Sequence, residues 1–235
     1  MSKGVVAFCI ALVVVGAPVC GGAATDLADE GHESGQVGAA HIIDYTPPKR
    51  GMPGARIGGG SRGMSAAELR LVAIVPDHVA LSARPDPTFC WYQAKPSTIK
   101  RLLVIDDGQG AKPMLEKEIE QPNQAGLQCL SVERFGVTLK AEVEYHWFID
   151  GVNSNEHRSK DVVSGGAVLY KAPSPELADK IKGSSSPDLP PLLAANGYWY
   201  DAMASVMAGL ASQPDDQRYL AMKEELLKQV GLPSY

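Results

Sequence analysis

Residues 142–149 read Glu-Val-Glu-Tyr-His-Trp-Phe-Ile, and this alternating stretch decides the fold class. In an extended chain successive side chains point to opposite faces, so one face of this segment is apolar and the other is polar. The apolar face consists of Val143, Tyr145, Trp147 and Ile149. The polar face consists of Glu142, Glu144 and His146. This pattern predicts a half-buried β-strand, and Asp150-Gly151 after it is typical of a turn.

Short segments of the same kind occur on both sides of this strand, with turn signals between them. They are Leu69–Val75, Thr88–Gln93, Leu102–Ile105, Met114–Ile119, Leu127–Val132 and Val162–Tyr170. Since no long helical pattern interrupts them, a parallel α/β sheet is disfavoured. We expect residues 64–171 to form an antiparallel, immunoglobulin-like β-sandwich. Gly165-Gly166 indicates a bulge or a close backbone approach.

Helical periodicity begins after a predicted linker at residues 172–187. One apolar stripe consists of Trp199, Ala202, Met203, Val206 and Leu210, and a second consists of Tyr219, Met222, Leu226 and Val230. A shorter helix is expected at about Pro190–Ala195, because Asn196-Gly197 is a good helix stop. Helices this short are not stable alone in water. The fold class is therefore mainly β with C-terminal α, in which residues 188–235 form a helical hairpin packed on or beside the sandwich.

The first 24 residues have the features of an export signal. Lys3 is the only charge before Asp26, the chain is apolar or small from Val5 to Val19, and Gly22-Ala23-Ala24 suits a signal peptidase. We expect cleavage after Ala24 and a periplasmic or secreted protein of a Gram-negative bacterium. Membrane contact would then arise only from an uncleaved segment, which has about the length needed to span a bilayer, or from a lipid on Cys20.

Residues 25–63 are predicted to be a disordered leader rich in Gly and Pro. The segment contains one aromatic residue, Tyr45, so it has little apolar surface to bury. All its acidic residues precede all its basic residues. The whole chain of 235 residues is 45% hydrophobic, which is typical of globular proteins. Its net charge of −5 argues against a nucleic-acid partner.

Cys90 and Cys129 are the two cysteines that remain after the signal is removed. In an oxidising compartment they could form a disulfide that closes a loop of about forty residues and stabilises the fold by about 2–4 kcal/mol. Alternatively they are two separate buried thiols. Two cysteines without a Cys-x-x-Cys pair, and histidines without a metal-ligand spacing, give no support for a metal site, and no cofactor is expected.

Several motifs resemble catalytic patterns. Gly58–Gly63 matches both G-x-G-x-x-G and G-x-S-x-G, but both need a strand before and a helix after, so we interpret it as a flexible or anion-touching loop. Asp106-Asp107 is interpreted as a turn. His146 with Glu142 and Glu144 could move protons or bind a cation, although a solvated strand face also explains these residues. We predict no catalytic set.

Four aromatic side chains on alternating strand positions could line a sugar or peptide groove, or could belong to the core. They are Phe89, Trp91, Tyr145 and Trp147.

Four stretches together resemble the exported bacterial family called domain of unknown function 928. They are Pro48–Gly63, Pro87–Tyr92, Tyr145–Phe148 followed by Arg158-Ser159, and Asn196–Ala202 with a closing Val230-Gly-Leu232. Some members of that family carry a Cys-Asp-Pro segment before the Arg-Ser pair, which is missing here, so any role of that cysteine does not transfer. The resemblance implies an exported protein and no particular activity.

The sequence thus favours a non-enzymatic protein that binds another envelope or secreted protein. The possible binding surface consists of His146, Glu142, Glu144, Trp91 and Arg158. One alternative is a small-ligand or glycan-binding sandwich that uses the strand aromatics. A further alternative, from a different class, is a hydrolase centred on His146.

Overall fold

The computed structural model describes residues 42–49, 56–58, 70–109, 112–120, 124–152 and 161–235. All of them belong to one compact unit, residues 40–235. The predicted signal at 1–24, the lipidation site Cys20, the serine of the Gly58–Gly63 motif, and Arg158 lie outside the described residues. Within the described ranges no helix has both the length and the apolar character needed to cross a membrane.

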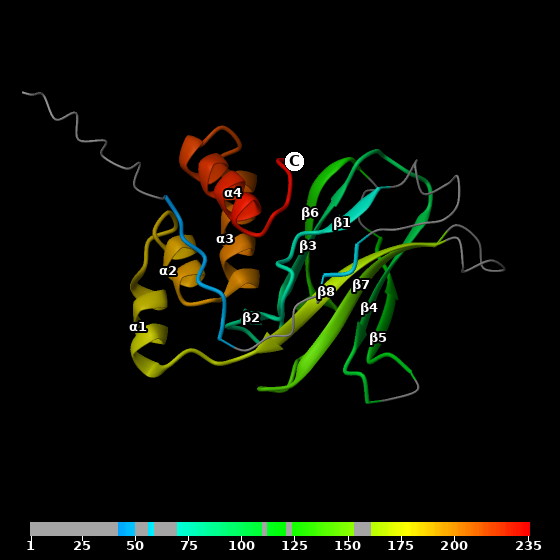
Figure 1. Cartoon of the computed structure of the whole chain (residues 1–235), viewed down its shortest axis with the longest axis horizontal. Helices are drawn as coiled ribbons and strands as arrows, with labels where there is room; N and C mark the ends of the chain where they lie inside the picture. Colours follow the sequence, from blue (N-terminus) through cyan, green and yellow to red (C-terminus); the bar gives the residue numbers. More distant parts are fainter. Residues whose placement is uncertain (1–41, 50–55, 59–69, 110–111, 121–123, 153–160) are drawn as a thin grey trace, which may run out of the picture. The chain divides into compact units, whose positions relative to one another are not determined.

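The larger of two sheets has the strand order β2-β8-β7-β4-β5. The bounds of its strands are β2 Ala80–Ser82, β4 Lys100–Asp106, β5 Leu115–Glu118, β7 Glu144–Val152 and β8 Val162–Tyr170. The predicted alternating strand is thus β7, and it lies at the centre of this sheet (Figure 1). Its inward positions are buried and its outward positions are half-buried or exposed, as its pattern predicts.

The expectation of an entirely antiparallel sandwich is wrong at one edge, because β2 pairs with β8 in parallel. β2 has only three residues, too few for an alternating pattern to reveal it in the sequence. Parallel neighbours need a long crossover connection. Here almost the whole sandwich, from residue 83 to residue 161, lies between the two strands and forms that connection.

The smaller sheet has the order β1-β3-β6 and is antiparallel throughout. Its strands are β1 Leu71–Ala73, β3 Thr88–Gln93 and β6 Gly126–Ser131, and β6 leads into a 3-10 helix, η2, at Val132–Phe135. The two sheets pack face to face. Phe89 of β3 stacks on Trp147 of β7 with ring centroids 4.4 Å apart, so these aromatic side chains form the centre of the core.

The close backbone approach expected at Gly165-Gly166 is confirmed. A Cβ added to Gly166 would lie 2.6 Å from the side chain of Val75. A Cβ added to Gly165 would lie 2.1 Å from the carbonyl oxygen of Trp147. Only glycine therefore lets β8 lie this close to its neighbours.

Four helices follow the sheets: α1 Pro175–Gly183, α2 Leu189–Ala195, α3 Trp199–Ser212 and α4 Gln217–Gln229. The prediction of a plain linker at 172–187 is wrong, because α1 occupies its middle. Ser174 caps this helix through a hydrogen bond to the amide of Leu177, and Pro175 occupies its first turn. No residue of α1 is fully buried. Its apolar side consists only of the partly buried Leu177 and Ile181, which is too short a stripe to predict the helix.

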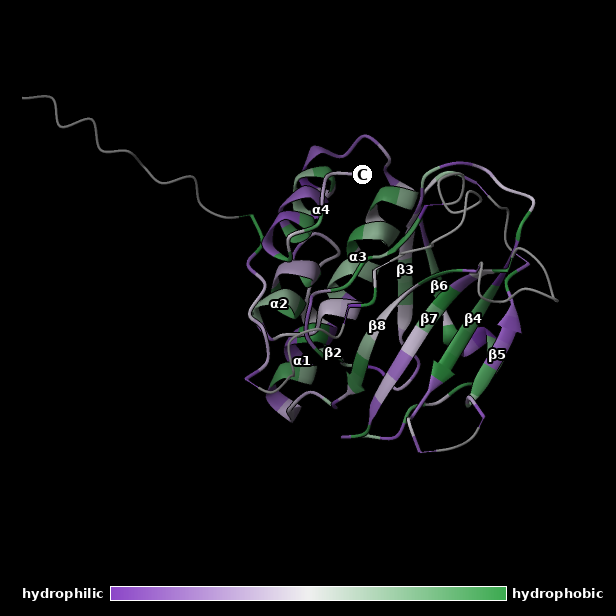
Figure 2. Cartoon of the chain, turned by 45° about the vertical axis from the view of Figure 1, so that its right-hand side comes forward, coloured by the Kyte–Doolittle hydropathy of each residue, from purple (hydrophilic) through white to green (hydrophobic). Residues whose placement is uncertain are grey.

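The helices pack against the sheets mainly through α3. The Nε1–H of Trp199 donates to the carbonyl of Ile74 over 3.0 Å. The Tyr200 hydroxyl accepts from Nε1–H of Trp147 and donates to the carbonyl of Ala167, each over 2.9 Å. Figure 2 shows the helices beside the sheets, with the largely green α3 next to the strands. Helices and sandwich therefore share one core.

The prediction of a disordered leader at 25–63 is wrong for residues 42–49. Ile43 and Tyr45 are buried in the core, and the backbone N–H of Tyr45 donates to Oε1 of Gln229 over 2.7 Å. Ile57 also forms an isolated β-bridge with Gly165. The average Gly/Pro-rich composition of the leader hides this short run of apolar residues.

Candidate functional site

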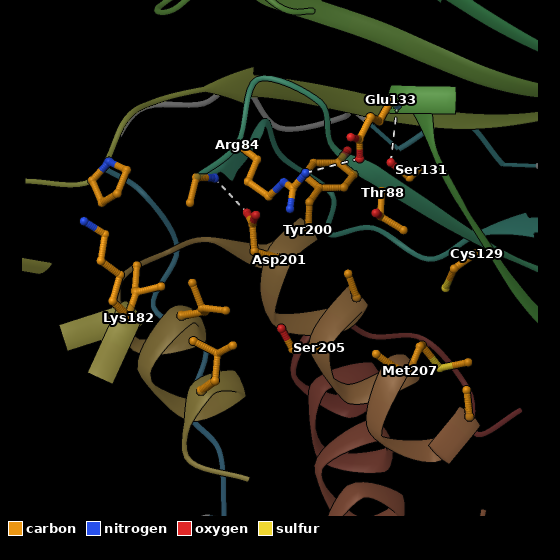
Figure 3. Close-up of a pocket in the computed structure, with 18 of the residues that line it drawn as sticks. Arg84, Thr88, Cys129, Ser131, Glu133, Lys182, Tyr200, Asp201, Ser205 and Met207 are labelled. Atoms are coloured by element: carbon orange, nitrogen blue, oxygen red, sulfur yellow. Dashed lines mark hydrogen bonds and ion pairs between the residues drawn. The ribbon is translucent and has the colours of Figure 1, made fainter. Parts of the chain in front are cut away.

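A groove of about 900 Å³ lies between the smaller sheet and the helices. β6 and the start of η2 form one wall, α3 forms the opposite wall, and parts of α1 and α2 complete it (Figure 3). On β6, the side chains of Leu127, Cys129 and Ser131 line the groove. They do so because successive residues of a strand point to opposite faces, and the alternate residue Leu130 is buried on the sandwich side.

Most of the groove is lined by apolar side chains. The larger ones are Leu127, Ile181, Leu189, Leu193 and Met207. On α3 the lining residues Ala204, Ala208 and Ala211 follow one another at helical spacing and share a face. Because alanine has only a methyl group, this face leaves room between α3 and β6. The groove therefore offers an apolar surface to an occupant.

Asp201 lies at one end of the groove, in the first turn of α3. Its Oδ2 accepts a hydrogen bond of 2.7 Å from the backbone N–H of Ala83. Burial raises the pKa of Asp201 to about 6, although hydrogen bonds from Ala83 and Ser82 act in the opposite direction. This carboxylate is therefore ionised at neutral pH and would favour a positive charge beside it.

Two further charged side chains, those of Arg84 and Glu133, line the same end of the groove (Figure 3). Nη2 of Arg84 lies 2.6 Å from Oδ2 of Asp86 and 3.5 Å from Oε2 of Glu133. The hydrogen bonds from Arg84 lower the pKa of Asp86. Together with Asp201, the lining at this end of the groove holds two carboxylates and one guanidinium, and Asp86 lies behind Arg84 as its ion-pair partner. A second cation, Lys182 on α1, lies across the groove from Glu133.

Cys90 of β3 and Cys129 of β6 are directly opposite each other in the register of the smaller sheet. The structure joins them by a disulfide, with Cα atoms 4.1 Å apart. The bond ties β6 to β3 at the centre of the strand whose side chains line the groove. It therefore fixes the position of this wall.

The predicted trio around His146 does not lie at the groove. His146 and Glu144 are neighbours on the outer face of β7, with Nε2 of His146 3.4 Å from Oε1 of Glu144. Their side chains are 42% and 48% exposed. Glu142 is exposed and precedes the strand, with a positive φ of 58°. The arrangement is that of a solvated strand face, and none of the three residues lines the groove.

The prediction that Trp91 forms part of a binding surface is wrong, because its exposed fraction is 0%. The guanidinium of Arg101, which is also buried, lies 5.9 Å from the centre of its ring. Phe89, Tyr145 and Trp147 are buried in the same core. The alternating aromatics therefore fill the sandwich, and none of the four forms a surface for a sugar.

Sequence reasoning missed Asp201, Arg84 and Glu133. Asp201 belongs to the Asn196–Ala202 stretch noted above, but an acid in the first turn of a helix is explained by the helix dipole alone. Arg84 and Asp86 flank a proline in a short polar segment, which is typical of a turn. In the described residues no three His, Cys, Asp or Glu side chains lie close enough together to hold a metal ion.

Comparison with known proteins gives a family and no activity. No curated protein matches the chain. Among solved structures, the fn3 domain of the human collagen alpha-1(XX) chain matches with a TM-score of 0.25 and 16% identity, covering 50% of this chain and 90% of that one. The family model described as Domain of Unknown Function (DUF928) matches residues 57–235, which include both sheets and all four helices. The chain therefore belongs to the DUF928 family.

Proposed function

We propose that this protein is a non-enzymatic binding module of the envelope or secreted fraction of a Gram-negative bacterium. The groove between β6 and the helices holds an apolar segment of a partner protein. The observation that carries the proposal is the groove itself, which has an apolar centre and charged residues at one end. This division between an apolar core and a polar rim is typical of protein interfaces.

The size and shape of the groove favour a polypeptide occupant. A volume of about 900 Å³ is near the upper end of the range for small-molecule pockets. Its walls come from a strand and from helices, so it runs along these elements (Figure 3). A glycan is a poorer candidate, because the strand aromatics that would stack on a sugar are buried.

Two features support an exported location. The first 24 residues have the apolar run and small-residue site of a signal peptide. Cys90 and Cys129 are joined, and disulfides persist mainly in oxidising compartments. Mass spectrometry of the protein purified from periplasmic and culture fractions tests the location. We expect a chain that begins at Thr25, and an intact Met1 confined to the cytoplasm would contradict export.

The binding function is tested by site-specific photo-crosslinking in living cells. A photoreactive residue at Ser205, which lines the groove, should give a crosslinked product, while the same residue at Lys117 on β5 should not. Mass spectrometry identifies the partner, and calorimetry then measures its binding to the purified protein.

The matched variants are Ala208→Trp, which fills the groove, and Ala141→Trp, which places the same ring on an exposed turn. We expect binding to be lost only in Ala208→Trp. Equal binding by both variants would contradict a groove site.

A further inference from the structure

One edge of β6 has backbone groups that point away from the sheet. The N–H of Ile74 donates to the carbonyl of Cys90, and the N–H of Ala94 donates to the carbonyl of Arg70. The even-numbered residues of β3 therefore bond to the β1 side, so its odd-numbered residues bond to β6. The N–H of Val132, which follows β6, donates to the carbonyl of Pro87, and this bond continues the same alternation because Pro87 is odd-numbered.

From the register of the pair, the residues of β6 that bond to β3 are Gly126, Gln128 and Leu130. Leu127 and Cys129 consequently direct their N–H and C=O groups to the outer edge, and Ser131 directs its N–H there. The carbonyl of Ser131, the N-cap of η2, accepts the first bond of that 3-10 helix. No described residue forms a backbone hydrogen bond with the outward groups of Leu127 and Cys129 or with the N–H of Ser131. The side chains of the same three residues line the groove. An open strand edge and an apolar groove therefore lie side by side.

The other described edges lack this combination. β1 and β2 have three residues each, and the N–H of Ala73 in β1 donates to Oγ of Ser164. β5 is Leu-Glu-Lys-Glu, and its charges make it hydrophilic (Figure 2). Short strands and charged side chains are how proteins keep sheet edges from pairing. β6 has six residues without a charge or a proline, so its edge is suited to pairing.

We propose that the partner binds by adding an extended strand to the outer edge of β6. This inference rests on the proposed function and specifies its mode. The backbone of the added strand bonds to Leu127, Cys129 and the N–H of Ser131, and its alternate side chains enter the groove. Backbone bonds supply affinity in such complexes, while the pockets for alternate side chains supply specificity.

The lining of the groove defines the chemistry of the added strand. The lining of the groove includes the apolar side chains of Leu127, Met207 and Ala211, so the strand carries apolar residues that pack against them. Near Ser131 the groove ends at Glu133 and Asp201. The guanidinium of Arg84 is already bound to Asp86 and Glu133, and Lys182 lies on the opposite side. A lysine or arginine of the strand is therefore placed at the Ser131 end.

Ser131 offers a matched pair of variants. Its φ of −76° is close to the value that proline requires. Ser131→Pro thus removes the outward N–H with little strain, and the ring blocks pairing at that position. Ser131→Ala keeps the N–H and removes only the hydroxyl that caps η2.

The probe is a library of random heptapeptides displayed on phage, selected against the mature chain. The best peptide is then synthesised with a fluorescent label. We expect selected peptides to combine alternating apolar residues with one basic residue. Ser131→Pro should weaken binding about tenfold or more, because it removes one hydrogen bond and its ring blocks the approach of the added strand. Ser131→Ala should change binding less than about threefold.

A second measurement uses the unaltered protein, so it does not depend on the folding of a variant. N-methylation of the peptide at each position in turn should weaken binding at every second residue, because alternate amides face β6. Ala208→Trp should abolish binding. These results together support the strand-addition mode.

Other outcomes separate the two proposals. Suppose that Ala208→Trp abolishes peptide binding, but that neither Ser131→Pro nor N-methylation of the peptide weakens it. This result would overturn strand addition and leave the groove as the binding site. If no peptide is selected, or if Ala208→Trp has no effect on binding, both proposals fail. A dimer in sedimentation that Ser131→Pro dissociates would overturn the peptide occupant in favour of a second copy of the chain.

Discussion

Tyr200→Phe removes one oxygen atom that two buried groups share. Trp147 donates its Nε1–H to this hydroxyl, and the hydroxyl donates to the carbonyl of Ala167. Because Tyr200 and Trp147 are both buried, water cannot replace the lost oxygen. A buried polar group without a partner costs about 1–3 kcal/mol. With two groups affected, we expect the free energy of unfolding to fall by about 2–4 kcal/mol.

Urea denaturation followed by tryptophan fluorescence measures this loss, and thermal unfolding should show a fall in Tm of roughly 5–15 °C. Tyr145→Phe is the matched control, because its hydroxyl accepts one bond of 3.2 Å, from the N–H of Lys140. We expect the control to lose about 1 kcal/mol or less. Equal losses in the two variants would refute the reasoning that Tyr200 fixes α3 to the sandwich.

Three further predictions concern stability. The pKa of Asp201 is about 6 in the folded protein against an ordinary value of 3.8, so this group stabilises the fold most at low pH and less as the pH rises through 6. Between pH 4 and pH 8 the free energy of unfolding of Asp201→Asn should therefore rise by up to about 3 kcal/mol relative to that of the wild type. If urea titrations show a difference between the two proteins that does not change with pH, this prediction is contradicted. Replacing Cys90 and Cys129 together by alanine should lower the free energy of unfolding by about 2–4 kcal/mol, seen as a lower urea midpoint; an unchanged midpoint would count against a stabilising bond. Gly209→Ala should cost about 1–3 kcal/mol despite the helix preference of alanine, because its Cβ would lie 2.4 Å from the ring of Tyr219; a raised Tm would contradict that packing.

The elements that could be predicted from the sequence are those that bury one face and are long enough to show a periodic pattern of apolar residues. Thr88–Gln93 and Val162–Tyr170 are strands with the predicted bounds, and the helix at Pro190–Ala195 differs by one residue. The stripe that begins at Trp199 is buried along most of α3. In these segments the periodicity of apolar residues reports burial directly, and burial is what the fold requires of them.

The sequence could not predict elements whose structure depends on distant partners. β2 has three residues, and its direction is set by pairing with β8, almost ninety positions later. Residues 42–49 become ordered through Gln229 and Ala194, which lie far along the chain. Local composition contains no information about such partners, and so both segments were predicted incorrectly or missed.

The candidate site was the least predictable part. Alternating aromatics such as Trp91 are consistent with both a binding face and a core. They belong to the core here because a second sheet covers the face on which they lie. The open edge of β6 follows from the hydrogen-bond phase of β3, which a sequence does not specify. Asp201 becomes a groove residue only because α3 packs beside the smaller sheet.

Amide hydrogen exchange measured residue by residue by NMR tests the central claim most directly. In the free protein, the amides of Leu127, Cys129 and Ser131 should exchange rapidly, while those of Gln128 and Leu130 should be protected by β3. Addition of a groove-binding peptide should slow the exchange of the first three amides and leave the other two unchanged. If those three amides are already protected in the free protein, or if they remain fast in the complex, the account of β6 as a receptor edge is contradicted.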